Sequence, residues 1–396
     1  MFKHWTRQTV AIAAVTALAI GLAGCGGTTT PSNNTTTPAP AATNTNKDPI
    51  KLGAVFILTG PSAGYGVSQQ AGLKVALAEI NAAGGINGHQ LDVQIEDSAG
   101  DKDKAINATQ KLIDKDNVLA IIGPTLSAEM FAAGPVATQK GVPILGVSNT
   151  ANGITAIGNY VFRNSLPEEG VLPTVVKTAK DKAKVANAAL LFDNQDDFSK
   201  SGGDVFKAAM DKEGIKIVDT ETFGTKDNDF GAQIDKALAA KPDGIFISSL
   251  YPAGSQLLIQ LRAKGYKGPV FGGNGFNSPK VFEIANNASE NLTVGSPWFS
   301  GATTPEATKF IDAYKKANDG KVPDQFAAQA YDGLKLMAKA IEKANTTTNR
   351  DKVRDALAGI TDYVGATGKF AFDKDRNPVQ APFVLQIQGG KYVELK

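Results

Sequence analysis

Residues 121–155 constrain the fold of this chain more than any other stretch, because they read as strand, loop, helix, strand and loop. The apolar runs at residues 119–122 and 142–147 are typical of strands covered on both faces of a parallel sheet. The helix between them carries Met130, Phe131 and Val136. Such a strand–helix–strand unit is right-handed and brings the carboxyl ends of both strands to one edge. The stretch therefore predicts an open α/β sheet.

Hydroxyl and amide side chains follow both of these strands. Ser127 opens the helix after the first strand, and Ser148, Asn149 and Thr150 follow the second. Open α/β sheets bind ligands at this edge, and free backbone N–H groups at a helix start suit an anion of carboxylate size. Helix capping by Ser or Thr is the alternative for either loop alone. Because both loops carry hydroxyls, the sequence favours a ligand site.

The rest of the chain repeats the alternation of strands and helices in two series. One series starts with a strand at residues 50–58, and the pattern restarts with another at residues 186–192. Helices at residues 305–317 and 324–343 resume the first series, and residues 363–372 and 382–395 read as late strands. Two such series predict two doubly wound lobes. A chain that crosses between lobes more than once makes a hinge that a ligand can close.

Composition excludes most catalytic chemistry. The 396 residues include one cysteine and two histidines, so a Cys/His metal cluster is excluded, and a nucleophile–histidine pair would depend on His89 alone. No dinucleotide fingerprint or phosphate-binding loop appears. A net charge of +2 gives no nucleic-acid surface. The sequence therefore predicts a protein that is not an enzyme, with no metal, no cofactor and no nucleic-acid partner.

The N-terminus has the layout of an export signal. Lys3 and Arg7 precede an apolar run at residues 10–22, which is too short to span a membrane. The run ends in Leu-Ala-Gly-Cys, which resembles a bacterial lipobox and implies cleavage before Cys25 and lipid attachment to it. A non-lipidated signal with a chance cysteine is the alternative. Residues 26–48 are too polar to fold and suit a flexible tether.

Several motifs together resemble the Leu/Ile/Val-binding family of periplasmic solute-binding proteins, which serve ABC importers. They are Thr-Gly-Pro at residues 59–61, Tyr-Gly at 65–66, Glu-Ile-Asn-Ala-Ala-Gly-Gly-Ile-Asn-Gly at 79–88, Ile-Gly-Pro at 122–124 with Ser127, residues 148–150, Phe-Arg at 162–163 and Ala-Tyr-Asp at 330–332. The resemblance covers essentially all of the chain from Pro49. It implies an α/β fold of two Rossmann-like lobes joined by three crossovers, near Ser165, Pro297 and Lys369.

The resemblance also implies roles for residues of the first lobe. The position of Ser127 bonds the ligand carboxylate in this family. The positions of Ser148 and Thr150 bond the carboxylate and the ammonium, partly through backbone groups. Tyr65 matches an aromatic residue that lines the pocket, and Phe198 matches another from the second lobe.

The chain departs from the family pattern at two positions. The acidic residue that commonly meets the ligand ammonium falls on Asn274, and a usual tyrosine falls on Leu250 with Tyr251 beside it. Glu168 matches another acidic position of the family and could take over the ammonium. Without that replacement, a carboxylate ligand is better supported than an α-amino acid.

The resulting prediction is a monomeric lipoprotein of the cell envelope. It has a signal peptide (residues 1–24), a lipidated linker (25–48), a first lobe (49–165 and 298–368) and a second lobe (166–297 and 369–396). It binds a small amino acid and delivers it to ABC permease subunits. The alternatives are a lipid-anchored sensor of the same fold and a receptor for a non-amino carboxylate or amide.

Overall fold

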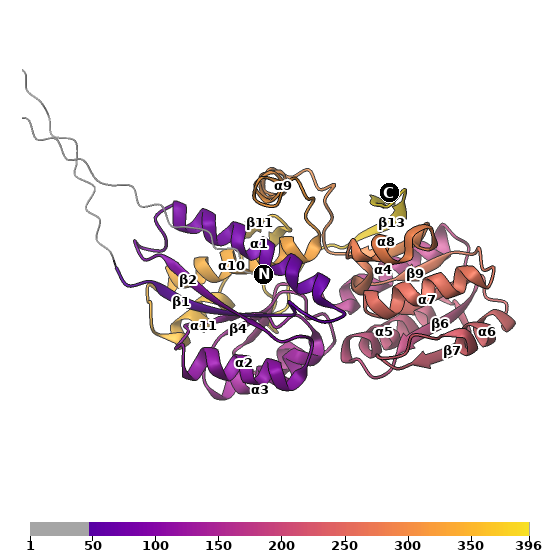
Figure 1. Ribbon diagram of the computed structural model, residues 1–396, viewed down its shortest axis with the longest axis horizontal. Coiled ribbons are helices and arrows are strands. Elements are labelled where there is room, and N and C mark those ends of the chain that lie inside the picture. The colour runs from indigo at the N-terminus through magenta and orange to yellow at the C-terminus, as the bar shows by residue number, and fades with distance from the viewer. Residues whose placement is uncertain (1–46, 396) are drawn as a thin grey trace, which may run out of the picture. The chain divides into compact units, whose positions relative to one another are not determined.

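The computed structural model describes residues 47–395 (Figure 1). The predicted signal peptide, Cys25 and almost all of the predicted linker lie outside these residues. Within the described part of the chain, no helix is both long enough and apolar enough to cross a membrane.

The first sheet has five parallel strands in the order β2-β1-β3-β4-β5. Their bounds are β1 Ile50–Phe56, β2 Leu91–Asp97, β3 Ile121–Ile122, β4 Ile144–Gly146 and β5 Val161–Arg163. Six of the seven residues of β1 are buried, because helices cover both faces of the sheet. Within the apolar runs at 119–122 and 142–147, strands β3 and β4 are shorter than the sequence predicted.

Helices from both ends of the chain cover this sheet. One face carries the core formed with α1 (Ala63–Ala82), α9 (Pro305–Ala317), α10 (Gln325–Ala344) and α11 (Arg350–Ala358). The other face carries α2 (Lys102–Asp114) and α3 (Ser127–Gln139). Gly72 allows α1 and α10 to approach closely, since a Cβ there would lie 2.0 Å from the Ala327 carbonyl oxygen. This approach places Tyr65 and Phe326 together, with ring centroids 4.6 Å apart.

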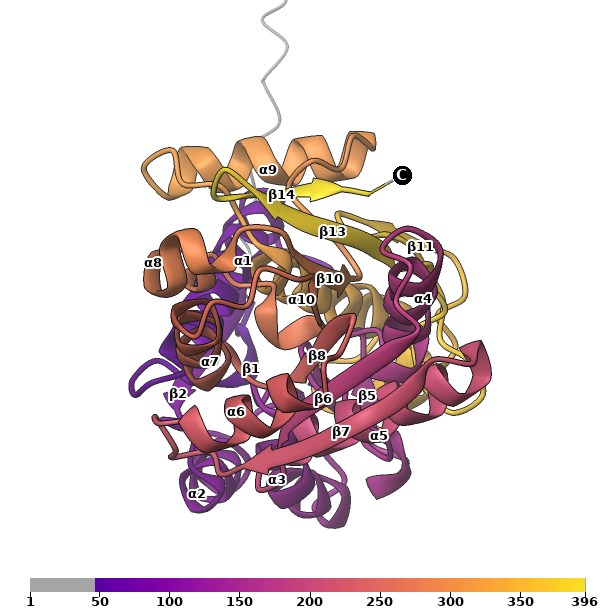
Figure 2. The same ribbon diagram turned by 90° about the vertical axis from the view of Figure 1, so that its right-hand side faces the viewer.

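The second sheet has seven strands in the order β14-β13-β10-β9-β8-β6-β7, as Figure 2 shows from β7 at the bottom to β14 at the top. The strands from β7 to β10 are parallel, whereas β13 and β14 pair in antiparallel fashion. The bounds are β6 Asn187–Asp193, β7 Lys216–Phe223, β8 Gly244–Ser248, β9 Val270–Gly272, β10 Leu292–Ser296, β13 Phe383–Gln388 and β14 Lys391–Glu394.

Helices cover both faces of the second sheet too. One core forms with α4 (Glu168–Asp181) and α5 (Asp197–Glu213). The other forms with α6 (Gly231–Ala239), α7 (Tyr251–Ala263) and α8 (Lys280–Ala285). Short 3-10 turns lie at Thr155–Ile157, Asn274–Phe276 and Asn286–Ser289. The expected α/β fold with two doubly wound sheets is confirmed.

The chain passes between the two sheets after β5, after β10 and before β13. The third passage comes later than Lys369, because β11 (Tyr363–Gly365) and β12 (Gly368–Phe370) form a hairpin whose aromatic rings join the core of the first sheet. Arg376 also donates to the Val161 carbonyl. The lobe limits stay a prediction, and we propose residues 379–382 for this crossover. The late strands at 363–372 and 382–395 are each two-stranded hairpins.

Candidate functional site

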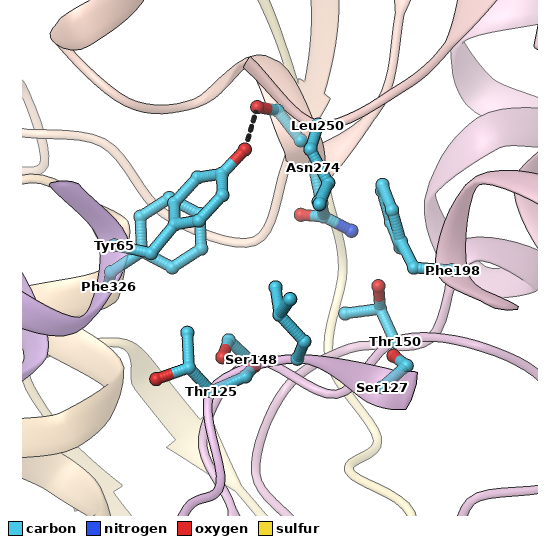
Figure 3. Close-up of a pocket in the computed structure, with 11 residues that line it drawn as sticks. Tyr65, Thr125, Ser127, Ser148, Thr150, Phe198, Leu250, Asn274 and Phe326 are labelled. Atoms are coloured by element: carbon cyan, nitrogen blue, oxygen red, sulfur yellow. Dashed lines mark hydrogen bonds between the residues drawn. The ribbon is translucent and has the colours of Figure 1, made fainter. Parts of the chain in front are cut away.

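A pocket lies where the carboxyl ends of strands from both sheets meet. The empty space within it is about 310 Å³, including the part continuous with solvent. Figure 3 shows Thr125, Ser127, Ser148 and Thr150 below the cavity and Asn274 above it. The lining residues are Tyr65, Thr125, Leu126, Ser127, Ser148, Thr150, Phe198, Leu250, Asn274, Gly275 and Phe326.

Ser127 presents a hydroxyl donor at the start of α3. As the first residue of the helix, it lies among backbone N–H groups without intrahelical partners, at the positive end of the helix dipole. Its Oγ accepts a hydrogen bond of 3.2 Å from the Ala151 N–H, which ties the two loops of the first sheet together. The hydroxyl proton has no acceptor within the described residues and is available to a ligand. We call this part of the pocket the donor end.

Ser148 differs because Gln69 occupies its hydroxyl. Gln69 is fully buried in α1; its Nε2 donates to Ser148 Oγ at 2.7 Å, and its Oε1 accepts from the Thr125 hydroxyl at 2.6 Å. Ser148 in turn donates to the Thr125 carbonyl, and Thr125 Oγ1 accepts from the Ile57 N–H at 3.1 Å. The protons of both hydroxyls are therefore used within the protein, so these side chains hold the loops in place.

Glu168 lies behind the pocket wall, where it accepts hydrogen bonds from both loops facing it. It is the first residue of α4 and is 1% exposed. Its Oε1 accepts from Thr150 Oγ1 at 3.1 Å and from Asn274 Nδ2 at 2.7 Å. Oε2 packs against Gly273, where an added Cβ would lie 2.6 Å away. We call the Thr150–Asn274 side of the pocket the acceptor end.

Burial dominates the electrostatics at Glu168. It raises the pKa of this carboxyl to about 7, against the hydrogen bonds from Asn274 and Thr150 and the positive charge of Arg163. Arg163 is itself buried, which lowers its pKa to about 10. Its guanidinium donates to the carbonyls of Asn149 and Ala151, at 3.1 and 2.7 Å, and to Asn377 Oδ1 at 2.7 Å. Arg163 thus holds the loop that carries Thr150.

Two tyrosines connect the two sides of the pocket. Tyr65 Oη donates to the Gly275 carbonyl at 2.5 Å and accepts from the Tyr251 N–H at 2.9 Å. Tyr251 Oη donates to the Pro61 carbonyl at 2.7 Å and accepts from the Gly64 N–H at 3.1 Å. Their rings meet edge to face with centroids 4.8 Å apart. These contacts hold the first and second lobes together at one side of the cavity.

Comparison with known proteins places the chain in a family. Residues 49–391 match the family described as periplasmic binding protein. The chain belongs to this family. A Pseudomonas aeruginosa protein, named as binding leucine, isoleucine, valine, threonine and alanine, is 30% identical over 83% of this chain and 86% of its own length. A Leu/Ile/Val-binding protein of Rhizobium johnstonii is 26% identical over 87% of this chain and 93% of its own.

Solved structures agree with this assignment. A branched-chain amino acid transporter substrate-binding protein of Streptococcus pneumoniae, in complex with isoleucine, gives a TM-score of 0.81 at 30% identity, over 88% of this chain and all of that one. A leucine-binding protein of Thermotoga maritima gives 0.83 at 25% identity, over 88% of this chain and 98% of that one. As a periplasmic binding protein, the chain is a binding protein and not an enzyme.

The structure of this periplasmic binding protein brings six of the nine predicted ligand residues to the pocket wall. They are Tyr65, Ser127, Ser148, Thr150, Phe198 and Asn274. The other three, Asn149, Glu168 and Tyr251, are buried behind the wall. Asn149 contributes its carbonyl to Arg163 and Ser165, and Tyr251 contributes its backbone N–H to Tyr65. Direct ligand contact stays a prediction for all nine.

Sequence reasoning missed Gln69, Gln325 and Phe326. Gln69 lies four residues before Leu73 on the apolar face of α1, and a polar side chain there was a usable signal. Phe326 and Gln325 lie in the first turn of α10, and nothing in the pattern connects that turn with the pocket. No cluster of His, Cys, Asp and Glu that could hold a metal ion occurs among residues 47–395.

Proposed function

We propose that this periplasmic binding protein captures a small α-amino acid with an aliphatic side chain and delivers it to the permease of an ABC importer. The observation that carries the proposal is the polarity of the pocket, which has a hydroxyl donor at Ser127 and, at Thr150, a hydroxyl oxygen whose proton goes to the buried Glu168 carboxyl. An α-amino acid offers the complementary carboxylate and ammonium. The names of the relatives, several of which bind leucine or isoleucine, support the same ligand class.

The carboxylate fits the donor end. The Ser127 hydroxyl and the unpaired N–H groups of the first turn of α3 would surround it, and the helix dipole favours negative charge there. The acceptor end suits the ammonium, because Glu168 places a buried carboxyl directly behind Thr150 and Asn274. The side chain would then contact the apolar wall formed by Leu126, Phe198, Leu250 and Phe326.

Ligand binding should also close the protein. Residues of both sheets line the pocket, and the tyrosine contacts join its two sides. A ligand that touches both sides stabilises the closed form over an open one. We further propose that the protein acts as a monomer outside the cytoplasm, tethered by lipid on Cys25. Cys25→Ser should abolish labelling with radioactive palmitate, and equal labelling of both proteins would contradict the anchor.

A thermal-shift screen of the mature protein against the common amino acids tests the ligand class. At about 100 times its Kd, a true ligand stabilises the fold by about 2.7 kcal/mol. Leucine, isoleucine or valine should give the largest shift, and small-angle scattering should show a smaller radius of gyration with that ligand. A screen in which only non-amino carboxylates or amides stabilise the protein would overturn the amino-acid proposal.

A further inference from the structure

A directed chain of hydrogen bonds ends at Glu168. Asn277 Nδ2 donates to Gln325 Oε1 at 2.8 Å, and Ser296 Oγ, whose single proton is shared with the Trp298 carbonyl, lies 2.8 Å from the same oxygen. Gln325 must therefore turn its amino group outward, and Nε2 donates to Asn274 Oδ1 at 3.3 Å. This fixes the Asn274 amide with its oxygen towards Gln325 and its Nδ2 towards Glu168. These hydrogen bonds orient one Asn274 N–H towards the Glu168 carboxyl.

These hydrogen bonds determine which donors remain free to bind a ligand in the cavity. The Thr150 hydroxyl proton and one of the two Asn274 amino protons are used by Glu168 Oε1. Thr150 therefore offers a ligand only the lone pairs of its hydroxyl oxygen, and Figure 3 shows the Thr150 and Asn274 side chains pointing into the cavity from opposite sides. A ligand group that only accepts hydrogen bonds, such as a second carboxylate or a ketone, finds no hydroxyl donor at Thr150 and faces the buried carboxyl of Glu168 behind it.

We propose that Glu168 is a positioning residue that sets the polarity of the acceptor end, so that the pocket selects an α-ammonium group over the deaminated analogue without Glu168 touching the ligand. The inference rests on the proposed amino-acid function and deepens it. It replaces direct contact between Glu168 and the ammonium with action through Thr150 and Asn274. The negative charge of Glu168, little screened in the buried site, then adds to the attraction for a cation.

The charged surroundings of Glu168 are sparse. Among residues 47–395, Arg163 on β5 is the charged group that acts most strongly on it; Asn274 and Thr150 from the facing loops are neutral, as are Gly273 and Leu172 beside it. Glu169 and Asp373 act on Arg163 from its other side. Because burial raises the pKa of Glu168 to about 7, an ammonium ligand should favour its ionised form and release a proton when it binds below that pH.

Isothermal titration with L-leucine and 4-methylpentanoate, its deaminated analogue, tests the inference. Glu168→Gln should weaken leucine binding by at least about tenfold, equivalent to about 1.4 kcal/mol, and change 4-methylpentanoate binding by less than about twofold. Glu129→Gln is the matched control, because burial raises its pKa to about 7 too, yet its bonded partner is the Leu126 N–H. Equal losses for both ligands in Glu168→Gln would overturn the inference.

The pH dependence of the wild type gives a second measurement that does not depend on whether a variant folds. Leucine affinity should fall as pH drops from about 8 to about 5.5, by up to about tenfold per unit below pH 7, and titration in buffers of different ionisation enthalpy should show proton release. Affinity for 4-methylpentanoate should not fall. Leucine binding that is independent of pH overturns the inference alone, whereas a wild type that prefers 4-methylpentanoate overturns the amino-acid proposal too. Binding of neither ligand at any pH overturns the amino-acid proposal as well.

Discussion

The donor end and the acceptor end of the pocket are built in different ways. The donor end belongs to one lobe: Ser127 and Ala151 come from two loops that follow neighbouring strands of the first sheet. The acceptor end joins Thr150 of the first lobe to Glu168 and to Asn274, which follows β9 of the second sheet. We therefore expect the donor end to exist before the lobes close and the acceptor end to be completed only on closure.

Removing Arg163 should disturb both ends and have the largest effect. Its guanidinium supports the backbone at Asn149 and Ala151, on either side of Thr150, and supplies positive charge near Glu168. Arg163→Met leaves buried oxygens without a donor and should lower the free energy of unfolding by about 3–5 kcal/mol. Urea denaturation measures this loss. Arg354→Met, at a partly exposed arginine whose partners are exposed carboxylates, should cost less than about 1 kcal/mol.

The next largest effect is the contribution of Glu168 to the pH dependence of fold stability. The pKa of Glu168 is about 7 in the folded protein against 4.5 for the unperturbed group. Between these pH values the folded state holds a proton that the unfolded state has lost, so the free energy of unfolding falls as pH rises through the window. The difference of 7 minus 4.5 corresponds to at most about 3 kcal/mol. Glu168→Gln should remove this part of the pH dependence.

Glu129 sharpens that comparison. Its pKa is also raised to about 7 by burial, so Glu129→Gln should flatten the stability profile in the same window. Denaturant unfolding between about pH 4.5 and about pH 8 measures both variants. The two should look alike in stability, and Glu168→Gln alone should change the preference for leucine. A flat wild-type profile would contradict the shifted pKa values.

The two ends also differ in how far the sequence could predict them. Ser127 and Ser148 follow two consecutive apolar runs, so the geometry of a parallel sheet was enough to place them together. The contact between Glu168 and Asn274 joins residues far apart in sequence, and its geometry depends on how α4 and β9 pack. Family resemblance marked both positions, but it could not show that the Glu168 carboxyl bonds Thr150 and Asn274 behind the pocket wall. Nor could it show that the Tyr251 hydroxyl bonds the Pro61 carbonyl; ligand contact by either residue stays a prediction.

At the donor end, alanine substitutions of Ser127 and Ser148 compare a hydroxyl that is free to bind ligand with one that is bonded within the protein. Ser127→Ala removes a free donor and should weaken leucine binding by about 1–3 kcal/mol, or about five- to 150-fold. Ser148→Ala should change affinity less, because its proton already goes to the Thr125 carbonyl. It should instead lower fold stability, since Gln69 Nε2 loses its acceptor. Titration should show the larger affinity loss in Ser127→Ala, and urea denaturation the larger stability loss in Ser148→Ala. A larger affinity loss in Ser148→Ala would contradict this prediction.

Tyr251→Phe tests closure with the smallest expected effect. The change removes two hydrogen bonds, to the Pro61 carbonyl and from the Gly64 N–H, and leaves the pocket lining intact. Both backbone groups can bond water when the lobes part, so the net loss is about 1 kcal/mol, or about fivefold in affinity.

The loss should appear as faster dissociation, because the tyrosine bonds form only after the ligand has entered an open cleft. Stopped-flow binding of leucine to wild type and Tyr251→Phe would measure it, with Tyr266→Phe as a control whose hydroxyl bonds the Pro269 carbonyl within the second lobe. An unchanged dissociation rate in Tyr251→Phe would mean that the acceptor end, rather than the tyrosine pair, holds the lobes closed.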